Sequence, residues 1–143
     1  MRFMMMVKAD KDSEAGVPPS QELIAAIGKH TEEAIKAGIV LSNGGLLPSS
    51  MGARVRLAGG KLSVSDGPFA ETKELIGGYA IVEAKSKHEA VELAKEFMKI
   101  HGDVLGSSYE GECEVRQMFD PGPCGSRAIE GQPEHAAAAA RTA

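Results

Sequence analysis

The chain has 143 residues, enough for one domain with a hydrophobic core and too few for two ordinary domains. Apolar residues make up 43% of it, which excludes a wholly disordered protein. The net charge is −4 and basic residues form no dense run, so we expect neither nucleic acid nor an anionic membrane surface as a partner.

The first part of the chain predicts a strand, a helix and a second strand. Residues 2–9 predict the first strand, with an apolar run of about five residues before Lys8. This run is shorter than a signal-peptide core or a membrane span, so we expect a cytoplasmic protein. After a loop, Ser20 is placed to cap a helix that ends at Gly38. Residues 39–50 predict a strand in which Gly44-Gly45 marks a bulge or a bend.

Residues 53–66 predict a β-hairpin whose turn is Gly59-Gly60. The register then pairs apolar residues on one side, Leu57 with Leu62 and Val55 with Val64, and polar residues on the other, Arg56 with Ser63 and Arg54 with Ser65. A shift of one residue would mix the two sides, so the register is well specified. The hairpin brings Asp66 to the end of its second strand.

The rest of the domain predicts a strand at residues 76–84, a helix that starts at a Ser86–Glu89 capping box, a loop at 101–111 and a strand at 113–119. This order is the split βαβ, ferredoxin-like α+β arrangement with an inserted hairpin. We expect one domain at residues 1–120. The Pro/Gly/Ala-rich appendage at 121–143 has no apolar periodicity, so its deletion should cost little stability.

Two strands are apolar at odd and even positions alike, Phe3–Val7 and Tyr79–Val82. Strands with this pattern are buried on both faces, yet two helices can cover only one face of such a sheet. A second copy that packs sheet against sheet would cover the other face, so the sequence predicts a homodimer.

Three stretches carry a family resemblance: "DGPFAETKELIGGYAIVEA", "ELIAAIGKHTEEAIKAG" and "GECEVRQMF". They resemble the DGPF group of YCII-related proteins, over roughly residues 1–120. The resemblance implies a dimeric α+β barrel. The wider group includes members to which a His–Asp pair acting on a small, often aromatic, substrate is attributed. The DGPF branch is largely uncharacterised, and its genes often lie near those of alternative sigma factors.

Asp66 is the first candidate site residue. An Asp side chain in a turn often accepts a hydrogen bond from the backbone two residues later, but that residue is Pro68, which has no N–H. The carboxylate must find Phe69 N–H, a distant group, water or a ligand. It is therefore either a turn residue or a carboxylate available for chemistry, with Phe69 packed beneath the loop beside a bound ligand.

His30 is the expected partner of Asp66, because it lies at the edge of the apolar face of the first helix and can act as a general base near neutral pH. The alternative is a hydrogen-bonded histidine at the edge of the core. Arg116, inside the last strand, needs a carboxylate such as Glu114 across a dimer interface, or an anionic ligand. No His or Cys spacing indicates a metal site.

Two functions remain open. One is a small-molecule enzyme without a cofactor, of lyase or isomerase type, that uses Asp66 with His30. The other is a non-catalytic dimer that binds a metabolite or has a regulatory role, in which the DGPF turn is structural. The small molecule is unknown in both, and the fold does not choose between them.

Overall fold

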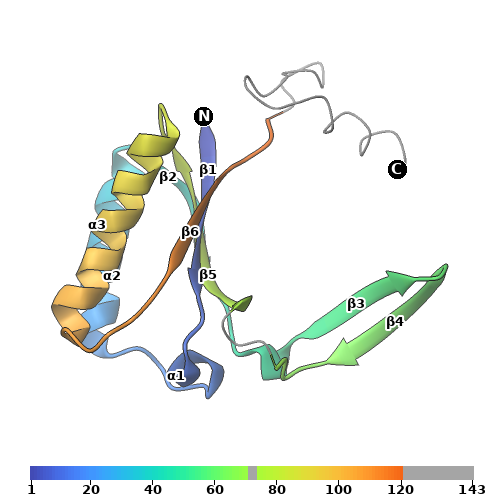
Figure 1. Cartoon of the computed structure of the whole chain (residues 1–143). Helices are drawn as coiled ribbons and strands as arrows, with labels where there is room; N and C mark the ends of the chain where they lie inside the picture. Colours follow the sequence, from blue (N-terminus) through green and yellow to red (C-terminus); the bar gives the residue numbers. More distant parts are fainter. Residues whose placement is uncertain (71–73, 121–143) are drawn as a thin grey trace.

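Four strands form one antiparallel sheet in the computed structural model, which describes residues 1–70 and 74–120. They are β1 (Arg2–Lys8), β2 (Val40–Gly45), β5 (Ile76–Glu83) and β6 (Cys113–Gln117), in the order β2-β5-β1-β6. The helices α2 (Gln21–Lys36) and α3 (Lys87–Leu105) cover one face of the sheet (Figure 1). The predicted ferredoxin-like α+β fold is confirmed.

Both long helices begin at the predicted serines. The Ser20 side chain accepts a hydrogen bond from Leu23 N–H at 3.2 Å, and Ser86 accepts one from Glu89 N–H at 3.1 Å. The first helix ends before Gly38, whose φ of 72° is the left-handed conformation that favours glycine. The second helix continues to Leu105, so the loop predicted from residue 101 is wrong for its first five residues.

The core lies between the helices and the sheet. Phe3 and Met5 of β1 are 1% and 5% exposed and pack with Val82 of β5 and Ala90 of α3. Side chains of alternate residues point to the other face of a strand.

That other face, the open face, is formed in its centre by Met4, Met6, Tyr79 and Ile81. No helix of the described chain covers it (Figure 1). A homodimer that covers this face stays a prediction.

The hairpin is a separate two-stranded sheet of β3 (Ala53–Ala58) and β4 (Lys61–Asp66). Its register is the predicted one, with Val55 opposite Val64 and Leu57 opposite Leu62. The turn glycines have φ values of 56° and 74°, the conformation that a two-residue hairpin turn requires. The hairpin projects away from the sheet, on the side that the helices leave open (Figure 1).

Two short elements differ from the sequence-based expectation. The loop after β1 contains α1 (Lys11–Glu14), capped by Asp10, which accepts a hydrogen bond from Ser13 N–H at 2.7 Å. The second strand ends at Gly45, with its register irregularity near Val40, and a 3₁₀ turn η1 (Ser49–Met51) follows.

The appendage at 121–143 lies outside the described residues. Within the described part, no helix has the length and apolar character needed to cross a membrane.

Candidate functional site

A cavity of about 310 Å³ lies between α2, α3 and the helix-covered face of the sheet. Its walls are mostly apolar, with Ile27 from α2, Val40 from β2 and Phe97 from α3 among them. No acidic side chain and no Lys or Arg of the described residues lines it. A cavity of about 150 Å³ can hold benzene, so this one is large enough for a molecule of one or two rings.

The cavity owes part of its space to glycines. Gly45 of β2 pairs with Gly78 of β5, and both line the cavity. A Cβ at Gly45 would meet no atom within 4 Å, whereas one at Gly78 would lie 3.2 Å from the Gly44 carbonyl oxygen. The bare backbone at Gly45 therefore leaves open volume that a side chain could fill.

His30 lies on the cavity wall. It is half-buried on α2, one turn from Ile27 and one turn from Ala34, and all three line the cavity. Its ring has no hydrogen-bond partner within the described part of the chain. The Asn43 side chain, from β2, lies at the same cavity and is exposed.

His101 is a cavity residue that the sequence analysis did not select. It is 9% exposed, and its ring lies between those of Phe97 and Tyr109, with centroids 4.8 and 5.7 Å away. Its Nδ1 is 3.1 Å from the Phe97 carbonyl oxygen. The sequence pattern that indicates burial of His101 was present, because this residue continues the helical face of Ala90, Ala94 and Phe97 at the i+3 and i+4 spacing.

Asp66 is not at this cavity. It ends β4 opposite Ala53, its side chain is exposed, and it does not line the cavity that His30 lines. Within residues 1–70 and 74–120 its carboxylate forms no hydrogen bond or ion pair. One chain therefore does not bring the two predicted catalytic residues together.

Backbone N–H groups of the turn after Asp66 form hydrogen bonds with the η1 segment and with the residue that follows it. Gly67 N–H donates to the Gly52 carbonyl at 2.9 Å, and Phe69 N–H donates to Ser49 Oγ at 3.1 Å. A Cβ at Gly67 would lie 1.7 Å from the Ser49 carbonyl oxygen, so only glycine fits there. This turn has a clear structural role.

The same serine connects the turn to α1. Ser49 donates from its backbone N–H to Glu14 Oε1 at 2.9 Å and from its hydroxyl to Glu14 Oε2 at 2.6 Å. Phe69 is half-buried, and the Arg54 guanidinium carbon lies 3.9 Å from its ring centroid. The aromatic side chain thus packs against a hairpin residue, at the base of the β3–β4 hairpin.

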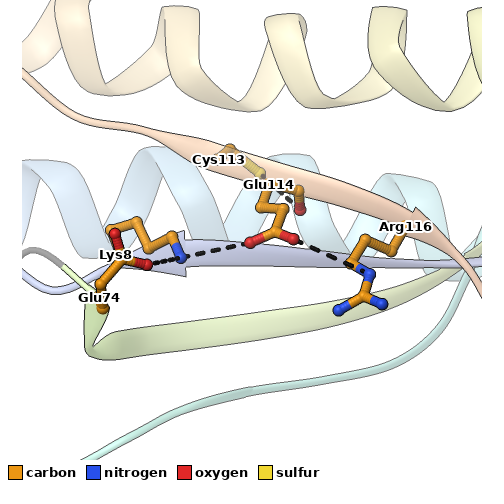
Figure 2. Close-up of polar contacts among 5 residues, drawn as sticks. All are labelled: Lys8, Glu74, Cys113, Glu114 and Arg116. Carbon is orange, nitrogen blue, oxygen red and sulfur yellow. Dashed lines mark hydrogen bonds and ion pairs between the residues drawn. The ribbon is translucent and has the colours of Figure 1, made fainter.

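Arg116 lies at one end of a row of ion pairs on the open face (Figure 2). Its Nε is 3.9 Å from Glu114 Oε1 of the same strand, and its side chain is 74% exposed. Lys8 Nζ lies 3.3 Å from Glu114 Oε2 and 3.4 Å from Glu74 Oε2. The hydrogen bond to Glu114 is the main cause that raises the pKa of Lys8. The carboxylate beside Arg116 therefore comes from its own chain.

Metal and thiol chemistry have little support in the described residues. They contain no group of three or more His, Cys, Asp or Glu side chains that could hold a metal ion. Cys113 is half-buried, and burial raises the pKa of its thiol, which disfavours the reactive thiolate.

Comparison with known proteins identifies a family. The model of the YCII-related domain matches residues 1–101. The uncharacterized protein R00369 of Rhizobium meliloti (strain 1021) is 32% identical over 101 residues, which are 69% of this chain and 74% of that protein.

Proposed function

The chain belongs to the YCII-related family, and from that premise we propose that it binds a small, largely apolar molecule in the cavity between α2, α3 and the sheet. One observation carries the proposal. Polar residues from several elements, among them His30, Asn43 and His101, line a cavity whose other walls are mostly apolar. Ligand sites have this composition, with few polar groups that orient the ligand in an apolar enclosure.

The polar groups indicate the chemistry of the ligand. A carbonyl oxygen only accepts hydrogen bonds, so His101 Nδ1, beside the Phe97 carbonyl, carries the hydrogen. In this tautomer Nε2 can accept a hydrogen bond, and the Asn43 amide can both donate and accept. With no charged lysine, arginine or carboxylate among the described lining residues, a neutral hydroxylated ring fits better than a phosphate or a polycarboxylate.

Thermal shift with a library of neutral one- and two-ring hydroxylated aromatics tests this proposal. A ligand that binds only the native state at 100 times its Kd adds about 2.7 kcal/mol to the free energy of unfolding, which raises Tm. Gly45→Val should fill the cavity and remove the shift. Ser42→Val is the matched control, because it adds the same side chain to the same strand at a position that does not line the cavity. Equal shifts for both variants, or no shift for the wild-type protein, would contradict the proposal.

The second candidate is a cofactor-independent enzyme of lyase or isomerase type that uses Asp66 with His30. The position of His30 at the cavity favours it, but Asp66 would have to come from a second copy of the chain. In a binding protein, Asp66→Asn should leave ligand affinity unchanged and His30→Gln should weaken it. If a bound compound is converted and Asp66→Asn abolishes its turnover but not its binding, the enzyme is the correct assignment.

A further inference from the structure

The hairpin exposes a continuous apolar face. Its four apolar side chains, Val55, Leu57, Leu62 and Val64, are 69%, 70%, 74% and 68% exposed. A single two-stranded hairpin is marginally stable in water, and an exposed apolar face adds a liability for aggregation. A surface of this kind is typical of a protein–protein contact.

The direction of the hairpin indicates where its partner lies. The hairpin projects on the side of the sheet that α2 and α3 leave open (Figure 1). A second copy placed against the open face would therefore lie beside the hairpin. Each copy then supplies the same two apolar surfaces to the contact, the hairpin face and the open face of the sheet, as a symmetric dimer requires.

Area gives the second argument. At a rise of about 3.3 Å per residue and about 4.8 Å between strands, a flat four-stranded face has a projected area of about 400 Å² and a hairpin face about 200 Å². Two open sheet faces should bury more than about 1,000 Å² of accessible surface, near the lower end of the roughly 1,200–2,000 Å² of stable specific interfaces. Two docked hairpin faces would enlarge this interface by half or more.

Charge indicates which part of the second copy is contacted. Residues 53–66 contain three basic side chains and one acidic side chain, a net charge of +2 in a chain of net charge −4, so the other residues carry −6. Two hairpins would repel each other, whereas a hairpin and the rest of a second copy attract.

We propose that the apolar face of the β3–β4 hairpin docks on the body of a second copy of this chain, so that each copy extends one arm across the other. The proposal is independent of any ligand in the cavity. It assigns a role to the hairpin, none of whose residues belongs to the hydrophobic core of the described part of the chain.

A pair of adjacent substitutions tests the arm in the full-length chain. Leu62→Asp places a charge on the apolar face, and Ser63→Asp places the same side chain on the opposite face of the same strand. Leu62→Asp replaces a leucine of the docked face with a charged side chain, so it should raise the dimer Kd at least about tenfold in sedimentation equilibrium. Ser63→Asp should change it far less. Equal dissociation constants for the two variants, or a wild-type protein that is monomeric at about 100 µM, would overturn the proposal.

Amide hydrogen exchange of the wild-type protein gives a measurement that needs no variant. If the arm docks on a second copy, exchange of the β3 and β4 amides should slow as protein concentration rises through the dimer Kd. Protection that does not depend on concentration would overturn the proposal, and would point to a different partner or to none.

Discussion

Gly67 shows how a single residue fixes the position of the hairpin. Its backbone approaches η1 so closely that an added Cβ would lie 1.7 Å from the Ser49 carbonyl oxygen. Its N–H also donates to the Gly52 carbonyl at 2.9 Å. A methyl group at this position must therefore push the turn and η1 apart and break hydrogen bonds on both sides of the contact.

Gly67→Ala should therefore destabilise the protein by about 1–3 kcal/mol, the usual cost of overpacking. Gly45→Ala is the control, because a Cβ there meets no atom within 4 Å, and it should change stability by less than about 0.5 kcal/mol. Urea unfolding of both variants provides the measurement. A similar loss in both would show that the contact between Gly67 and Ser49 is not required.

The same contacts explain why the role of Asp66 could not be predicted from sequence. The sequence showed that Pro68 has no N–H and that Phe69 N–H is one possible donor to the Asp66 carboxylate. The group that takes that N–H is Ser49, which is 20 residues earlier in the chain. Pairing across such a distance depends on how the loops pack, and no local pattern encodes it. His101, in contrast, was accessible from helical periodicity alone.

Among the elements, those with local start and stop signals were predicted best. The two N-cap serines and the hairpin register are confirmed, because a cap and a two-residue turn depend on residues close together in the chain. The end of α3 and the helix α1 were missed. Gly102 and Gly106 favour a loop by propensity, but the packing of His101 against the core keeps the helix intact to Leu105.

The cap of α3 can be tested directly. Ser86 Oγ accepts from Glu89 N–H at 3.1 Å, whereas the Glu89 carboxylate accepts from Lys85 N–H and not from Ser86 N–H, so the N-cap forms without the reciprocal bond of the predicted capping box. Ser86→Ala should lower the free energy of unfolding by about 1 kcal/mol. Ser107→Ala, in the exposed loop after the helix, should have almost no effect. Thermal or urea unfolding compares the two, and equal stability would mean that the helix does not depend on this cap.

At the scale of the whole molecule, the two faces of the sheet have different surroundings. The helices cover the Phe3 and Met5 side, and the opposite side carries apolar residues in the two central strands with ion pairs toward β6. The sequence predicted this imbalance, since both faces of the central strands are apolar. It could not show that the hairpin projects toward the uncovered side, because the direction of an arm is set by packing at its base.

The open face gives the last prediction. Ile81 lies in its centre, paired with Met4 and Ser42, so Ile81→Glu would bury a charge if a second copy covers this face. We expect the dimer Kd to rise at least about tenfold. Leu47→Glu makes a similar change at a residue that is 76% exposed and outside the sheet, and it should leave the Kd unchanged.

Sedimentation of this pair, read together with Leu62→Asp, separates the two surfaces. If both Ile81→Glu and Leu62→Asp dissociate the dimer, the sheet face and the arm each contribute to one interface. If only Ile81→Glu does, the sheet faces hold the dimer without the arms. If only Leu62→Asp does, the arms hold two copies whose sheets do not meet, and the predicted sheet-to-sheet packing is wrong.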